Sequence, residues 1–163
     1  GLPGSCDFEH DFCSWKNVYT DDMDWVENNG VTGTWNTGPI SDHTLGTPEG
    51  TYFYMEASSI PQGSIATVYS EPFGMSDTDM CINFWYHMYG GGIGTLTVQQ
   101  LLSNGDVIDL WTMSGNQGNQ WMPGRVGFYQ TQDYYLIFNA TRGNGPSGDI
   151  CIDDITMTRG YCS

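Results

Sequence analysis

Apolar and polar residues alternate along several segments in the second half of the chain. In the segment 81–89, one set of alternate positions carries Ile82, Phe84, Tyr86 and Met88. Because successive side chains of a β-strand point to opposite faces of its sheet, this alternation predicts a strand with one face against a core. The same pattern, rich in β-branched or aromatic residues, predicts strands at 52–57, 64–70, 94–102, 107–112, 134–141 and 150–157. No segment has the periodicity of a helix.

Turn-forming sequences separate these expected strands. Glycine-rich or polar breaks cover 90–92, 103–106, 114–119 and 143–148. In the second of them, Asn104-Gly105 favours the positive φ angles of a tight hairpin. Residues 7–48 alternate less clearly, and we interpret them as one early strand with ordered loops held by Trp15, Trp25 and Trp35. Many short strands joined by turns predict an all-β fold, a two-sheet antiparallel β-sandwich.

Length, composition and charge narrow the class of protein. The 163 residues, of which 39% are hydrophobic, suffice for one domain with its own core, which we expect to span residues 6–162. Residues 1–5 we interpret as a processed leader or an expression remnant. The formal net charge is −15 with only 4 Lys and Arg residues, which argues against nucleic acid as a partner. No apolar run is long enough to cross a bilayer, so we expect no direct membrane insertion.

The cysteines point to an oxidising compartment. They lack the paired CxxC spacing of a zinc site, and the chain contains the glycosylation sequon Asn139-Ala140-Thr141. Disulfides in a protein outside the cell therefore fit better than metal-binding thiols. From the residues alone, Asn139 is either a glycosylation site or a chance match to a short pattern, and the spacing of Cys6 and Cys13 allows a local bridge.

Several short motifs occur together, in order, between Cys6 and Cys162. They are CDFE at 6–9, CSW at 13–15, GPISDHTLG at 38–46, CINFWYHMYG at 81–90, GTLTV at 94–98, QWMPGRV at 120–126 and SGDICIDDI at 147–155. With these motifs the chain resembles a MAM domain, the extracellular module of meprins, the A5 antigen and the mu receptor tyrosine phosphatase. The resemblance implies a jelly-roll-like sandwich that is one module of a larger cell-surface or secreted protein, without catalytic activity of its own.

The resemblance also implies a disulfide pairing, Cys6 with Cys13 and Cys81 with Cys162. Cys151 is left over, at a position where similar modules usually carry alanine. Its place on the face opposite Ile150 and Ile152 leaves two alternatives, a small buried residue or an exposed thiol able to bridge to another chain. Other pairings stay open, because the spacing of the residues does not determine connectivity.

A group of acidic residues suggests a bound cation. It consists of Glu9, Asp42, Asp153 and Asp154, with Thr44 and Gly46 in the loop after Asp42. Carboxylates are costly to gather inside a fold without positive charge, and calcium takes carboxylate and carbonyl oxygens as ligands. The resemblance implies a structural calcium or similar ion held by Glu9, Asp42 and one of the last two aspartates. Asp154 has the parity of Ile150 and Ile152, so we expect it to be the inward ligand; the alternative is that these acids are turn caps and surface charges.

No catalytic motif accompanies the candidate bases His10, His43 and His87. The sequence has no GxSxG, HExxH or phosphate-binding loop, and we expect His87 to be packed within its strand and His43 to brace the calcium loop. We therefore interpret the chain as a non-enzymatic module that binds protein ectodomains, either those of another protein or a second copy of itself in a homodimer. A carbohydrate-binding sandwich and a passive spacer are the alternatives. The negative charge opposes self-association unless the acids stay off the interface or are screened.

Overall fold

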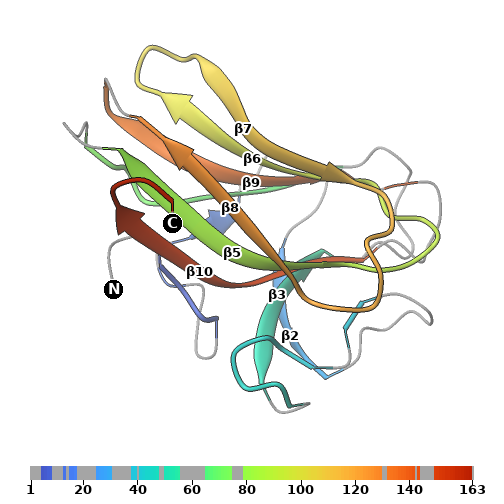
Figure 1. The fold of residues 1–163 in the computed structure, drawn as a ribbon. Coiled ribbons are helices and arrows are strands. Elements are labelled where there is room, and N and C mark those ends of the chain that lie inside the picture. The colour runs from blue at the N-terminus through green and yellow to red at the C-terminus, as the bar shows by residue number, and fades with distance from the viewer. Residues whose placement is uncertain are drawn as a thin grey trace.

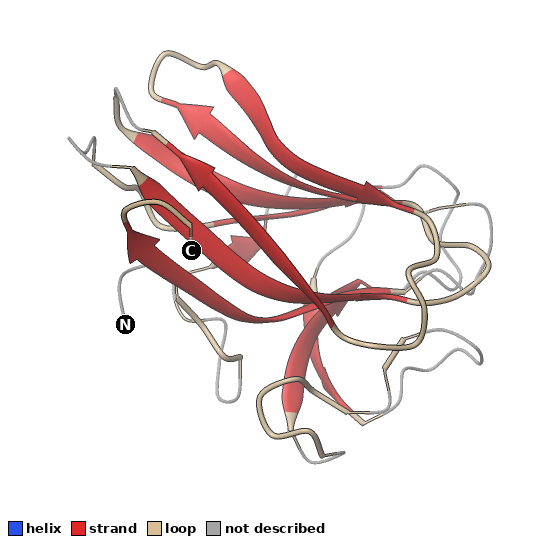
Figure 2. Ribbon diagram, viewed as in Figure 1, coloured by secondary structure: helices blue, strands red, loops and turns tan. Residues whose placement is uncertain are grey.

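The computed structural model describes residues 5–8, 13, 15–17, 25–30, 38–39, 41–47, 50–55, 65–74, 79–129, 132–141, 143 and 149–162. These ranges contain strands and no helix (Figure 1; Figure 2). The strands are β1 (Lys16–Asn17), β2 (Val26–Asn29), β3 (Thr51–Met55), β4 (Ile65–Tyr69), β5 (Met80–Met88), β6 (Thr95–Leu102), β7 (Val107–Ser114), β8 (Met122–Phe128), β9 (Tyr134–Thr141) and β10 (Ile150–Arg159). Across the described residues, no helix is long and apolar enough to span a membrane.

The strands form two five-stranded sheets. The first sheet has the order β1-β4-β9-β6-β7 and the second sheet has the order β2-β3-β10-β5-β8, with every described pairing antiparallel. Figure 1 shows them as two layers, with β6, β7 and β9 in one and β5, β8 and β10 in the other. Strands distant in the sequence become neighbours, since β10 lies between β3 and β5. The expected all-β, two-sheet, jelly-roll-like sandwich is confirmed.

The core lies between the inner faces of the two sheets. Ile82, Phe84, Tyr86 and Met88 on β5 are at most 3% exposed. Alternate residues of β9 face them from the first sheet and are likewise buried. Trp15 and Trp25 join this core, and the Trp25 indole donates a hydrogen bond to the Ala66 carbonyl at 3.0 Å. The apolar parity of the sequence therefore marks the inner face of these strands, and the expected packing role of these two tryptophans is confirmed.

Three local features differ from the expectation. The strand β8 was not expected, because Pro123, Gly124 and Gly127 weaken the strand pattern of its sequence. Among the described residues of the N-terminal part, two short strands, β1 and β2, stand where one was expected. In the β6–β7 turn only Gly105 has a positive φ, so the turn is longer than a two-residue hairpin and closes with a hydrogen bond from the Leu102 N–H to the Asp106 carbonyl at 2.8 Å.

The disulfides have the expected pairing. Cys6 is bonded to Cys13, and Cys81 to Cys162. The first bridge closes a short local loop, whereas the second ties the start of β5 to the residues after β10. Cys151 lies outside both bridges and is fully buried on β10, so the buried alternative is correct and an exposed intermolecular thiol is not.

Candidate functional site

The acidic pair lies at an irregular point of β10. The pairing of β10 with β5 shifts register between Asp153 and Thr156, and Asp154 has a positive φ of 48°. As a result Asp153 is fully buried, while the side chain of Asp154 is 22% exposed. The expectation that Asp154 is the inward residue was wrong, because a β-bulge interrupts the alternation on which it rested.

Asp153 is held by backbone donors from the loop 41–47. One of its carboxylate oxygens accepts hydrogen bonds from the His43 N–H at 2.9 Å and the Thr44 N–H at 3.2 Å. The other accepts the N–H of Asp154 at 2.9 Å. Burial, followed by the neighbouring charge of Asp154, raises the pKa of Asp153 to about 8, although these hydrogen bonds act in the opposite direction. An ionised Asp153 therefore lacks compensation from positive charge in its described surroundings.

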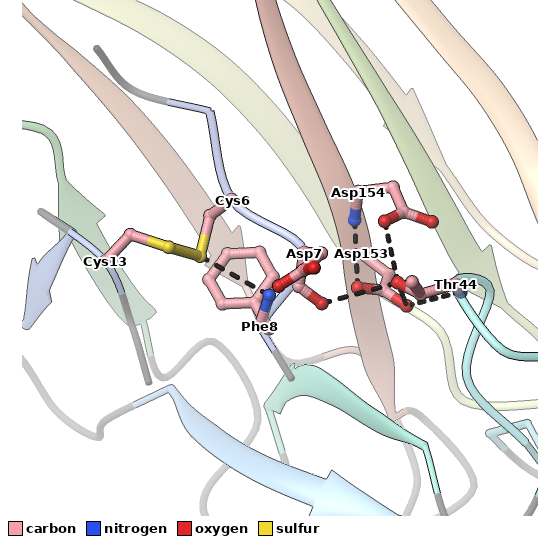
Figure 3. The surroundings of a disulfide bond; sticks show 7 residues. All are labelled: Cys6, Asp7, Phe8, Cys13, Thr44, Asp153 and Asp154. Atoms are coloured by element: carbon pink, nitrogen blue, oxygen red, sulfur yellow. Dashed lines mark hydrogen bonds between the residues drawn. A yellow bond between two sulfur atoms is a disulfide. The ribbon is translucent and has the colours of Figure 1, made fainter. Parts of the chain in front are cut away.

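Asp154 completes the attachment of the same loop. Its two oxygens contact His43 Nδ1 at 2.5 Å and the Thr44 hydroxyl at 2.6 Å. The His43 ring stacks on Trp85 with centroids 4.0 Å apart, which confirms that His43 braces this loop. Figure 3 shows the Thr44 hydroxyl joined by hydrogen bonds to the two aspartates and to the backbone of Asp7, whose carbonyl oxygen lies 3.4 Å from the hydroxyl.

The first disulfide helps to bring Asp7 to this position. Cys6 and Ile155 exchange backbone hydrogen bonds of 2.8 Å in both directions, so the N-terminal segment runs beside β10. The bridge to Cys13 then closes the segment on itself (Figure 3). The oxygen donors gathered here are two carboxylates, one hydroxyl and one backbone carbonyl, which is the donor type that hard cations take.

Asp42 is buried but serves its own loop. Its carboxylate oxygens accept hydrogen bonds from the N–H groups of Leu45 and Gly46, each at 3.0 Å, and Gly46 has the positive φ that this turn requires. The Gly50 backbone lies directly against the same carboxylate, with no room for a β-carbon. Within the described ranges no three His, Cys, Asp or Glu side chains converge on a metal position. Glu9 and His10 lie outside those ranges.

His87 is a packed residue rather than an accessible base. It is 1% exposed, its Nε2 lies 3.1 Å from the Asn119 side-chain oxygen, and its ring packs edge-on against Trp121. Burial lowers the pKa of His87 to about 4. These surroundings agree with the expectation that it serves packing within its strand.

The sequence analysis missed a surface that the pairing of the first sheet creates. We call it the neutral face: the side chains of β1, β4, β9, β6 and β7 that point away from the core. Hydroxyl and amide groups pair across it, at 3.0 Å between Thr67 and Asn139 and at 3.1 Å between Thr97 and Thr112. The Thr-x-Thr pattern of β6 hints at such a surface, but its cross-strand partners follow only from the register. Asn139 of the sequon lies in the middle of this face.

A family model described as MAM domain, meprin/A5/mu, matches residues 6–163. The chain belongs to the MAM family. The MAM domain-containing glycosylphosphatidylinositol anchor protein 1 of Rattus norvegicus is 37% identical over 166 residues, covering 97% of this chain and 17% of that protein. Thyroid hormone-induced protein B of Xenopus laevis is 36% identical over 165 residues, covering 99% of this chain and 24% of that protein. This MAM domain thus corresponds to a small part of either relative, and it is an extracellular module of a family of adhesion-type modules.

Solved structures share the fold of this MAM domain. The K1 cleaved adhesin domain of Lys-gingipain from Porphyromonas gingivalis W83 superposes with a TM-score of 0.68 at 14% identity, covering 99% of this chain and 100% of that one. The CBM22-1–GH10 modules of a Clostridium thermocellum xylanase, complexed with xylohexaose, give a TM-score of 0.61 at 18% identity over 95% of this chain and 28% of that one. At these identities the likeness concerns the fold alone.

Proposed function

We propose that this MAM domain is a recognition module without enzymatic activity that binds protein ectodomains, and that the neutral face supports association with a second copy. The observation that carries the proposal is the family match over nearly the whole chain. It is supported by the described histidines, of which His87 is buried in packing and His43 is engaged with Asp154 and Trp85. A fold that offers a rigid binding surface, and not a reactive side chain, agrees with the family match and with the engagement of these histidines.

The neutral face suits self-association because it avoids the charge of the molecule. Among the described residues of its strands, only Lys16 and Asp109 bring charges to it, one of each sign. The whole chain carries a net charge of −15, so two copies repel each other wherever their acids meet. Ile65 and Tyr135, each 36% exposed, add apolar area to this surface. Contact through the neutral face therefore brings few charges of like sign together.

Sedimentation velocity of the chain without a glycan at Asn139, over a concentration series at physiological salt, tests this proposal. We expect a concentration-dependent dimer. Thr97→Glu places a negative charge in the middle of the neutral face of each copy and is expected to weaken the dimer about tenfold or more. Thr156→Glu adds the same charge on the exposed part of β10 in the second sheet and serves as the matched control. A chain that stays monomeric at high concentration, or equal effects of the two variants, would contradict self-association through this face and favour another partner or a spacer role.

A structural cation is part of the same proposal. Asp153, Asp154, the Thr44 hydroxyl and the Asp7 carbonyl offer the oxygen chemistry of a calcium site, and a cation bound there would favour the ionised form of the buried Asp153. Asp42 and Gly46 would hold the loop in place, with Glu9 as a further ligand. Bound there, the ion would neutralise the acidic pair and fix the loop 41–47 to β10.

Glycan binding is a second candidate, favoured by one observation beyond the fold. A cavity of about 420 Å³ is lined by Pro72, Leu101, Ser103, Asp133 and Tyr135, among others, and thus combines an aromatic ring with polar groups. Such a combination suits a sugar. A glycan array of the whole chain tests it, and binding lost in Tyr135→Ala but retained in Tyr135→Phe would support this candidate.

A further inference from the structure

A small pocket lies at the end of the sandwich where the second disulfide joins β5 to the residues after β10. Its volume is about 320 Å³, and it is lined by Asp79, Gly127, Phe128, Tyr129 and Tyr161. The size falls at the lower limit of pockets that accept small molecules or single side chains. Neither the loop 41–47 nor the neutral face contributes a residue to it.

The two sides of this pocket are fixed relative to each other. Asp79 stands just before Cys81 and Tyr161 just before Cys162, so the disulfide ties both sides together. The Gly160 N–H also donates a hydrogen bond to the Asp79 carbonyl at 2.6 Å. Phe128, at the base, packs against Tyr134 of the core with ring centroids 5.7 Å apart. The backbone on both sides of the pocket is therefore held in place before a ligand binds, which lowers the cost of ordering it.

The pocket combines exposed aromatic rings with one carboxylate. Tyr161 is 87% exposed, the highest value among the large hydrophobic side chains described, and Tyr129 is 56% exposed. Arg159 pairs with Met80, the residue next to Asp79, but within the described chain no ion pair links Asp79 to Arg159. Tyrosine is enriched among the residues that dominate the binding energy of protein interfaces.

We propose that this pocket receives an arginine side chain of a partner ectodomain, an inference that rests on the proposed function of binding other proteins. A guanidinium group can stack on the faces of Tyr129 and Tyr161 while it donates hydrogen bonds to the carboxylate of Asp79. The net charge of −15 attracts a basic partner over long range. A second copy is a poor occupant, because it carries the same charge and only 4 Lys and Arg residues. A neutral sugar is not attracted by the negative charge of the chain.

An NMR titration of the isotopically labelled 163-residue chain tests this inference, with three probes. The first is acetyl-Gly-Arg-Gly-amide, the second is the same peptide with citrulline, which keeps the shape and lacks the charge, and the third is xylohexaose. We expect the arginine peptide to shift the signals of residues 79, 127–129 and 161, with an affinity that falls as salt rises. The citrulline peptide should bind about tenfold more weakly.

Two pairs of variants complete the test. Asp79→Asn should weaken the arginine peptide about tenfold, whereas Asp106→Asn, which removes the same charge from the exposed β6–β7 turn, should leave it unchanged. Tyr161→Ala should weaken it and Tyr161→Phe should retain it; Tyr161 is so exposed that neither change should disturb the fold. Equal binding of the two peptides, shifts confined to other surfaces, no shifts, or stronger binding of xylohexaose would each overturn the inference. None of these outcomes bears on the dimer that we expect in sedimentation, so the proposed function can survive the failure of this inference.

Discussion

His87 shows how a single buried side chain sets a pH dependence. Burial lowers its pKa from 6.5 to about 4, so the folded state favours the neutral ring. The stability that this residue contributes is present above pH 6.5 and is lost as the pH falls towards 4. The loss amounts to about 3 kcal/mol at pH 4. Urea unfolding at several pH values measures it, and His87→Gln should remove that part of the slope; an unchanged slope in the variant would contradict the assignment.

The acidic pair allows a direct test of the proposed cation. If calcium binds at Asp153 and Asp154, a concentration about 100 times the Kd stabilises the fold by about 2.7 kcal/mol and raises the Tm by about 5–10 °C. Thermal unfolding in calcium and in EDTA measures the difference. Asp154→Asn, in the partly exposed position, should reduce it, while Asp106→Asn in a distant turn should not. An equal Tm in calcium and EDTA would remove the structural ion from the proposal.

The acidic pair and its loop could be predicted from the sequence only in part. Asp153, Asp154 and Thr44 could be selected from the sequence, since oxygen-bearing side chains near a glycine-containing loop suggest a hard cation. Which aspartate points inward could not be predicted, because the bulge at Asp153 depends on pairing with β5. Nor could the position of Asp42, whose carboxylate is engaged by the N–H groups of its own loop.

At the scale of the element, β8 depends on a glycine that packing requires. A β-carbon at Gly124 would overlap the ring of Phe84 on the paired strand β5. Gly124→Ala should therefore destabilise the domain by about 1–3 kcal/mol, because the buried Phe84 has little room to move. Gly91→Ala is the matched control, since a β-carbon there meets nothing within 4 Å. Urea unfolding measures both variants, and an equal effect of the two would show that Phe84 adapts freely.

A strand could be predicted from the sequence where its apolar and polar residues alternate clearly. β5 and β9 each turn one face towards the core, so alternate apolar residues identify that face in the sequence. β8 has glycine on that face, at Gly124, where another strand would carry a large apolar residue, so no alternation identifies it. The order of the strands could not be predicted, because periodicity gives the face of a strand and not its neighbour. For that reason the neutral face, which is built from five strands, could not be predicted from the sequence.

For the whole molecule, the net charge of −15 determines where contact is tolerated. Acids at the surface of one copy repel those of a second copy, whereas the neutral face presents one charge of each sign in its described strands. Salt screens the repulsion between the other surfaces of the two copies, so the dimer should become tighter as the salt concentration rises. The pocket formed by Asp79, Tyr129 and Tyr161 should bind the arginine peptide more weakly under the same change. These opposite salt effects separate the two surfaces.

Glycosylation of Asn139 should act as a block on self-association. Asn139 lies on β9, the central strand of the first sheet, and its side chain faces outward to receive a hydrogen bond from Thr67 at 3.0 Å. A glycan there is bulky and would cover the middle of the neutral face. Thr141→Ala removes the sequon, whereas Thr141→Ser keeps it, and both can be secreted from a cell that glycosylates and checked by intact mass. We expect sedimentation to show a dimer for Thr141→Ala and a monomer for glycosylated Thr141→Ser. If glycosylated chains dimerise as tightly as those without the sequon, the contact lies elsewhere on the molecule, since two sheets cannot meet with a glycan between them.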